Sequence, residues 1–195
     1  MGIQEVRVPL HWNYFLALED DLIRLSRFIE FTNANFTSYS IDIARIILTS
    51  TSEVDVVSKL LCRKIDNNSK AGRINQYRDE INPHFTEIKD FKVRIPRYGL
   101  ELEPWTNWSD NKSPYWWTDY NKIKHQRNDH FDKANLKTTL NSVAGLFILL
   151  LYLHKEDAES GNLSPSPSLF RVADKYYQGT ELGGYEPRII YRLTF

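Results

Sequence analysis

The 195-residue chain has one cysteine, no excess of charge of either sign and no long apolar run, and each shortage excludes a class of protein. The single cysteine, Cys62, rules out an intramolecular disulfide and a cysteine-rich zinc site. Lysine plus arginine and aspartate plus glutamate number 25 each, so the chain lacks the global basic field of a dedicated duplex-binding protein. A nucleic-acid ligand would need a local patch of positive charge.

The most apolar segment, residues 143–153, is 11 residues long, whereas a membrane span needs about 20. It therefore predicts a buried core helix. The first residues contain no basic stretch followed by an apolar run, as a secretion signal would. We expect a cytoplasmic protein that does not enter a membrane.

The motifs of several common enzymes are also missing. The sequence contains no glycine-rich phosphate loop, no G-x-S-x-G elbow, no H-E-x-x-H and no spaced set of cysteines and histidines. His125 and His130 are five residues apart, which separates them by about 140° on a helix and makes them poor partners for one metal ion. We therefore predict no metal and no cofactor.

Apolar residues that recur every three or four positions predict a mainly helical protein. They indicate helices over about 13–31, 40–65 and 74–81, the last ending before Pro83 because the residue before a proline disfavours helix. The 40–65 stripe is the strongest, with Ser50 as its only polar member. A further helix carries the apolar positions from Leu136 to Leu150.

Short alternating segments predict a small sheet of two or three strands beside the helices. Residues 4–10 alternate up to Pro9, and KVRIP at 92–96 echoes EVRVP at 5–9, so these two are candidates to pair as edge strands. Residues 187–195 are a candidate third strand in the same sheet. Residues 156–168 have the composition of a surface loop or linker. We therefore divide the chain into a helical domain, 1–155, and a C-terminal extension, 156–195, that packs on it.

The most informative segment is 116–136, which is predicted to be a helix starting with Ser113 as N-cap and Pro114 at its first position. One face of that helix would carry a polar row at positions i, i+3, i+4 and i+7, formed by Asn121, Lys124, His125 and Asn128. Its apolar stripe lies roughly a quarter turn away and consists of Trp116, Tyr120, Ile123 and Phe131. The polar row would thus border a packed seam, where side chains are both oriented and open to a ligand.

Individual residues near this row have alternative interpretations. Lys124 either extends past aromatic neighbours or supplies a positive charge to an anion. We expect Arg127 to stack on a tryptophan or to reach an acid on another helix. Glu53, in the 40–65 helix, either forms a salt bridge with Lys124 or Arg127, the preferred interpretation, or serves as an acid or base beside His125. Asp129 either orients His125 or forms an ordinary surface pair with it.

The hexapeptide YNKIKH, residues 120–125, followed by a long apolar helix, resembles the signature helix of the HEPN superfamily, whose motif is R-N-x-x-x-H. The resemblance covers about residues 12–155, and the earlier long helix bearing Glu53 fits it. Asn121 and His125 occupy the motif's Asn and His positions, and Tyr120 stands at its arginine position. The fold that the resemblance implies is an antiparallel bundle of four to five helices, to which we add the small accessory sheet.

The resemblance also implies a homodimer with the motif at its two-fold groove. In HEPN ribonucleases it implies metal-independent RNA cleavage, in which the ribose 2′-hydroxyl attacks the adjacent phosphate, the histidine transfers protons and the arginine stabilises the charged intermediate. Losing one such donor costs about 10² to 10³ in rate, and tyrosine cannot replace the charge. Lys124, next to Asn121 and His125, is the better substitute cation, ahead of Arg127.

Two main hypotheses follow, and the sequence leaves open whether the protein is an enzyme. The first is a HEPN-like endoribonuclease of toxin or defence type, with His125 as acid and base, Asn121 orienting the phosphate or the histidine, and Lys124 as electrostatic stabiliser. The second is a non-catalytic HEPN-like dimeric module that binds a nucleotide, an RNA or a protein partner through the same groove, with further binding residues Tyr120, Arg127, Asn128 and Glu53. A third is a structural subunit whose groove is filled by tryptophans of a second copy.

Overall fold

The computed structural model describes residues 8–183 and 186–193. Within these residues the protein is mainly helical, with seven α-helices and two small antiparallel sheets of three and two strands. Short 3-10 helices lie at Asn33–Asn35, Ile88–Asp90, Pro96–Tyr98, Thr106–Asp110, Phe131–Lys133 and Asp174–Tyr176. The predicted mainly helical class with a small amount of sheet is confirmed.

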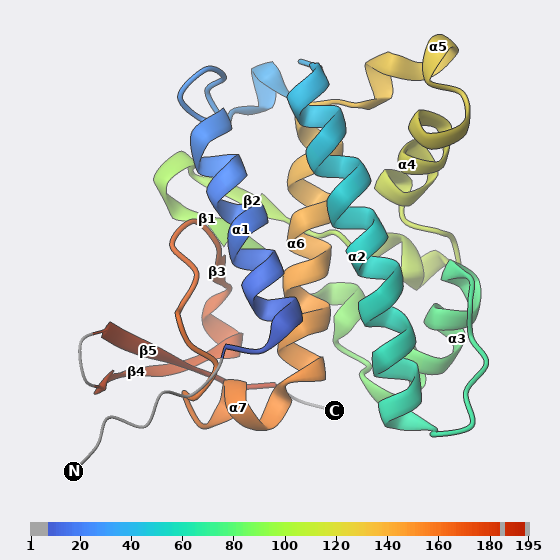
Figure 1. Cartoon of the computed structure of the whole chain (residues 1–195). Helices are drawn as coiled ribbons and strands as arrows, with labels where there is room; N and C mark the ends of the chain where they lie inside the picture. The colour runs from blue at the N-terminus through green and yellow to red at the C-terminus, as the bar shows by residue number, and fades with distance from the viewer. Residues whose placement is uncertain (1–7, 184–185, 194–195) are drawn as a thin grey trace.

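Helix α6 (Leu136–Leu153) lies at the centre, with α1 (Leu10–Leu25) and α2 (Ile41–Ile65) packed on it (Figure 1). Helix α3 (Ile74–His84) packs on α2, and α4 (Tyr115–His125) packs on both α2 and α6. Helices α2 and α6 run in the same direction. Their first turns are joined because the Leu136 N–H donates to the Ser38 carbonyl, and at their last turns the Lys64 ammonium donates to the Leu153 carbonyl. The bundle is therefore not the purely antiparallel one that we predicted.

Helix α2 has the bounds that its sequence pattern predicts. The hydroxyl of Ser40 accepts a hydrogen bond from the backbone N–H of Ile43, 3.2 Å away, and so caps the first turn. Asp42 in the first turn and basic residues in the last turn complement the helix dipole. The buried Ser50 meets the Ser142 hydroxyl of α6 at 2.8 Å, which places a polar link inside the long contact between these helices.

Helix α6 is buried on every side. Asn135 caps it by accepting from the N–H of Thr138, and nearly all residues of the helix are buried. In the described part of the chain it is the one helix long and apolar enough to cross a membrane, but 89% of that 18-residue window is buried inside the protein. Such burial is typical of the core helix of a soluble protein, as the apolar run predicted.

Tryptophans attach α4 and the preceding loop to α6. The indole N–H of Trp105 donates to the Gly145 carbonyl at 3.2 Å, and that of Trp116 donates to the Pro104 carbonyl at 2.7 Å. Both indoles are fully buried. Gly145 makes this packing possible, because a Cβ on it would lie only 3.1 Å from Trp116 and 3.5 Å from Trp105.

The strands pair differently from our prediction. Strand β1 (Val93–Ile95) lies between β2 (Leu100–Leu102) and β3 (Arg171–Val172), whereas β4 (Tyr177–Gly183) and β5 (Glu186–Tyr191) form a separate ribbon. The predicted third strand thus forms as β5 but does not join β1. Residues 4–7 of the predicted strand at 4–10 lie outside the described residues, as do 194–195 of the predicted C-terminal strand.

Three predicted helix boundaries are wrong. Helix α1 begins at Leu10 and ends at Leu25, where the Ser26 hydroxyl donates to the Ile23 carbonyl and the next turns tighten. Helix α3 continues through Pro83, because a proline in the last turn removes only one backbone hydrogen bond from the helix. Helix α4 has Pro114 rather than Ser113 as its N-cap, since the Ser113 hydroxyl donates to the Asn75 side chain.

The C-terminal extension packs on the helices. Its predicted loop begins with a short helix, α7 (Lys155–Glu159), where we expected none. Beyond it, the Phe170 ring lies 6.1 Å from that of Phe15 and 6.2 Å from that of Phe147. The buried carboxylate of Glu19 accepts the backbone N–H groups of three consecutive residues, 168–170. Helix α1 and the extension are therefore joined by buried polar contacts and by an aromatic cluster.

Candidate binding site at the end of helix α4

The predicted helix over 116–136 breaks at Gln126. That residue has φ −139° and ψ 40°, and the chain continues as the four-residue helix α5 (Arg127–His130) before a 3-10 turn leads into α6. Every residue from 124 to 129 is exposed. Because no side chain there gains burial by staying on the axis of α4, packing does not favour continuation of the helix.

The break divides the predicted polar row. Asn121, Lys124 and His125 remain together on the exposed side of α4, over its last turn. Asn128 and Arg127 instead line a different groove, against α2. The prediction that Asn128 completes a four-residue row is therefore wrong, because the row assumed an unbroken helix.

Asn121 and His125 line a shallow groove of about 350 Å³ between the end of α4 and the start of α3, which we call the α3–α4 groove. Its remaining lining residues are Ile74, Ser113, Trp117, Thr118, Lys122 and Gln126. No hydrogen bond or ion pair joins the side chain of Asn121 or His125 to any other described residue. Both are therefore open to a ligand.

Lys122 and Gln126 belong to the same groove, and the sequence reasoning missed them. They are four residues apart and each follows a predicted site residue, so helix geometry places them on the adjoining row. The position of Lys122 on that adjoining row is a signal that the sequence does contain. Gln126 is the C-cap residue of α4, where the helix breaks.

Tyr120, at the motif's arginine position, is 7% exposed, and its ring packs 5.8 Å from that of Trp117. The ammonium of Lys124, one turn later, lies 5.5 Å from the centre of the Tyr120 ring. Lys124 thus extends along an aromatic neighbour and still has an exposed position. The geometry fits a weak cation–π contact that leaves the ammonium open to an anion.

Glu53 has a partner that we did not predict. Its Oε1 lies 2.5 Å from Nδ1 of His11 on α1, and both side chains are mostly buried. Neither the expected salt bridge with Lys124 or Arg127 nor a position beside His125 is present. Glu53 therefore lies outside the site at the end of α4.

Two further expectations also fail. Arg127 neither stacks on a tryptophan nor reaches a described acid, and its Nε–H donates to the Ile123 carbonyl at 3.4 Å. Asp129 makes no hydrogen bond to His125 in the described structure. The acid of α4 is instead the half-buried Asp119, which accepts from the Thr138 hydroxyl at 3.0 Å and whose pKa is raised by partial burial. Asp119 joins α4 to α6 and faces away from the groove.

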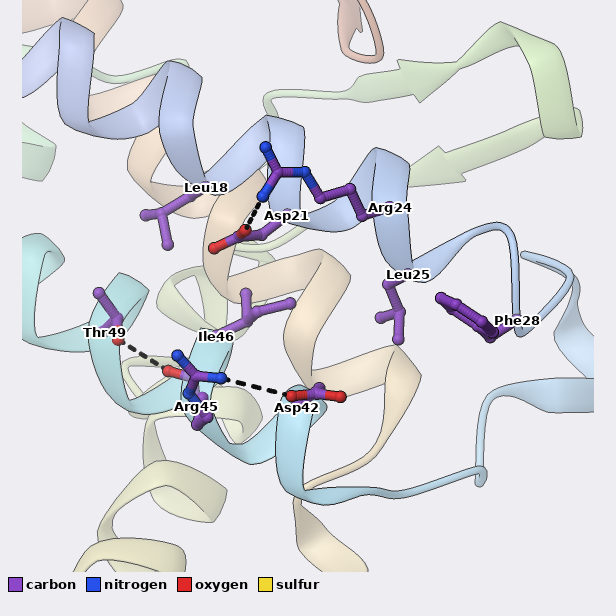
Figure 2. A pocket seen from close by; sticks show the side chains of 9 residues that line it. All are labelled: Leu18, Asp21, Arg24, Leu25, Phe28, Asp42, Arg45, Ile46 and Thr49. Atoms are coloured by element: carbon purple, nitrogen blue, oxygen red, sulfur yellow. Dashed lines mark hydrogen bonds and ion pairs between the residues drawn. The ribbon is translucent and has the colours of Figure 1, made fainter.

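A second groove, of about 270 Å³, lies between α1 and α2 and is shown in Figure 2. Its apolar part contains Leu18, Leu25 and Ile46. Two ion pairs follow it, Asp21 with Arg24 at 3.9 Å and Asp42 with Arg45 at 3.5 Å. The α1–α2 groove therefore has balanced charge.

Comparison of the chain with protein families, with curated proteins and with solved structures finds no match. Among the residues that the structure describes, no three His, Cys, Asp or Glu side chains lie together in a way that could hold a metal ion. The function is therefore inferred from the geometry of these grooves and from the YNKIKH segment of α4.

Proposed function

We propose that the protein is a HEPN-like cytoplasmic module that binds single-stranded RNA as a homodimer, without cleaving it, through the end of α4. One observation carries this proposal. Asn121, Lys124 and His125 lie exposed over one helical turn, and none of them forms a hydrogen bond or an ion pair with another described residue. An amide, an ammonium and an imidazole so placed are suited to phosphate and ribose oxygens.

Binding is favoured over catalysis by two features. The position that carries a cation in the HEPN motif holds the buried Tyr120, which cannot stabilise a charged phosphorane. In addition, no described carboxylate orients the His125 imidazole, whereas catalytic histidines usually have such a partner. The residues are therefore better arranged to hold a phosphate than to transfer protons at it.

The dimer follows from the family resemblance and from the openness of the site. On one copy, Asn121 and His125 line a shallow groove, and Lys124 lies exposed beside them in the last turn of α4. A second copy related by a two-fold axis would bring an identical set across from the first and enclose the ligand from both sides.

The second candidate function is a metal-independent endoribonuclease. One contact favours it, because the Lys124 ammonium is held 5.5 Å from the ring at the motif's arginine position and so places a cation beside Asn121 and His125. In this alternative His125 transfers protons and Lys124 stabilises the phosphorane.

Fluorescence anisotropy with a labelled single-stranded RNA in EDTA tests the binding proposal. We expect wild-type protein to bind and Lys124→Ala to bind more weakly, with a salt dependence lower by about 0.7 in the log–log slope, the value for one lost phosphate contact on a single strand. Lys70→Ala, which removes an exposed lysine from the loop after α2, is the matched control and should bind like wild type. Absence of RNA binding by the wild type would refute the proposal.

The same incubation, analysed on a gel, distinguishes the two functions. Intact RNA at high protein concentration supports the binding module. Products with cyclic-phosphate ends that disappear with His125→Ala would establish the ribonuclease instead. Light scattering after size exclusion measures the mass of the particle, and a monomer at every concentration that binds RNA would contradict the dimer.

A further inference from the structure

A third groove, of about 480 Å³, lies between the first half of α2 and the α5 turn, and we call it the α2–α5 groove. It exists because the break at Gln126 turns Arg127 and Asn128 away from α4 and toward α2. Its lining residues are Ile41, Ala44, Arg45, Leu48, Arg127, Asn128 and Phe131. None of these residues is Asn121, Lys124 or His125, so the groove is separate from the site proposed above, although Arg127 follows His125 by only two positions in the chain.

The charge of the lining favours an anion. The lining contains two guanidinium groups, Arg45 and Arg127, and no carboxylate. Arg45 borders both grooves, because it also lines the α1–α2 groove in Figure 2, where Asp21 and Asp42 balance Arg24 and Arg45. Arg45 contacts Asp42 at 3.5 Å, but both side chains are about three-quarters exposed, at 78% and 74%. Such an exposed i, i+3 pair contributes little, so a phosphate can replace the aspartate as the partner of Arg45.

Aromatic surface lies beside these guanidinium groups. The Phe131 ring is half-buried and meets the Tyr39 ring edge to face, with ring centres 5.6 Å apart. Tyr39 is 54% exposed and Ile41 is 71% exposed, so both are accessible to a ligand. Aromatic faces interleaved with arginines are the arrangement on which proteins stack the bases of single-stranded nucleic acids.

We infer that the α2–α5 groove binds one nucleotide unit of a single-stranded RNA, an inference that rests on the RNA binding proposed above. Arg45 and Arg127 hold a phosphate, Tyr39 and Phe131 contact the base, and the Asn128 amide is available to the ribose or the base edge. His125 and Arg127 are only two residues apart in the chain, so a single RNA strand that contacts the end of α4 can continue into this groove.

The experiment uses the full chain and a labelled single-stranded RNA of about 12 nucleotides, within the usual site sizes of single-strand binders, in EDTA. We expect Arg45→Ala to lower the log–log salt slope by about 0.7. We expect Tyr39→Ala to weaken binding about tenfold at an unchanged slope, since stacking is not electrostatic. Arg24→Ala is the matched control, because it removes an arginine from an equivalent i, i+3 ion pair in the charge-balanced groove.

The outcomes separate the two proposals. If wild type binds RNA and Lys124→Ala weakens it, while Arg45→Ala and Tyr39→Ala behave like Arg24→Ala, the groove inference is wrong and the RNA-binding function stands. If wild type does not bind, both are wrong. An acidic peptide that binds in an Arg45-dependent way without competing with RNA would also overturn the inference, because the groove would then serve a protein. Circular dichroism of each variant confirms that it is folded.

Discussion

Nδ1 of His11 lies 2.5 Å from Oε1 of Glu53, and this contact joins the first turn of α1 to the middle of α2. The side chains are 22% and 14% exposed, so the pair is largely withdrawn from water. The phenol of Tyr14 lies close enough to Glu53 that the carboxylate adds to the rise in the Tyr14 pKa caused by burial. A carboxylate in this position needs its partner, because an unpaired charge at such a site is costly.

Replacing His11 with Ala should lower the free energy of unfolding by about 1 to 2 kcal/mol, since Glu53 is left without its hydrogen-bond donor. A double-mutant cycle with Glu53→Gln should give a coupling of about 1 kcal/mol in urea unfolding. Additive losses from the two single variants would show that the contact contributes no net stability.

Replacing Glu19 with Ala should cost about 3 kcal/mol or more in urea unfolding, because it leaves two buried backbone donors and one partly buried donor without an acceptor. The carboxylate accepts the N–H groups of Ser168, Leu169 and Phe170 at 2.8 to 2.9 Å and is 2% exposed. The neighbouring Asp20→Ala, at an exposed position, is the control and should change stability little. Equal effects of the two substitutions would contradict this account.

Replacing Gly145 with Ala should destabilise the protein by about 1 kcal/mol, because overpacking of about 1 to 3 kcal/mol exceeds the gain in helix propensity. The new Cβ would lie 3.1 Å from Trp116, whose indole is held by its hydrogen bond to Pro104. Gly72→Ala is the matched control, since its nearest contact, at 3.9 Å, is ordinary. Thermal unfolding of both variants measures the difference, and an unchanged melting temperature for Gly145→Ala would show that the indoles can move.

The stability of the fold should fall as the pH drops below about 6.5. Burial lowers the pKa of His154, and its Nε2 is buried without a described partner. The pKa of His154 is lower in the folded protein than in the unfolded chain, so the unfolded chain binds the proton more readily once the pH falls below the unfolded value. Acid therefore favours unfolding. Urea unfolding at about pH 7.5 and about pH 5.5 should show a smaller decline for His154→Gln than for wild type. An equal decline would assign the effect to other groups.

The central helices could be predicted from the sequence because their signals are local. The apolar stripe over 40–65 predicted the extent of α2, and the apolar run after Leu136 predicted α6 as the buried core helix. In each case the periodicity and the cap lie within the helix itself. Neither depends on a partner elsewhere in the chain.

The site could be predicted only in part, because helical periodicity assumes that the helix continues. Asn121 and His125 share the α3–α4 groove, as expected from their i, i+4 spacing. The break at Gln126 leaves no periodic signal, because it reflects the absence of burial along an exposed polar segment. The true partner of Glu53 lies 42 residues earlier in the chain, and nothing local to α2 indicates it.

The predicted strand pairing was wrong because it, too, depends on contacts between distant parts of the chain. Strand pairing is set by which segments the core brings together, and strands of two or three residues carry almost no pattern of their own. The echo between residues 5–9 and 92–96 was therefore weak evidence. Gly99, with φ 62° in the turn between β1 and β2, was a better local signal for the hairpin that forms.

The buried carboxylate of Glu19 also constrains when the protein can finish folding. Its partners lie 149 to 151 residues later in the chain, so they leave the ribosome long after α1 has been made. Until then the charge on α1 must stay hydrated, which keeps that face of the helix from docking fully. Helix α1 therefore reaches its final environment only after residues 168–170 have been synthesised, and the nascent chain leaves part of the core exposed until then.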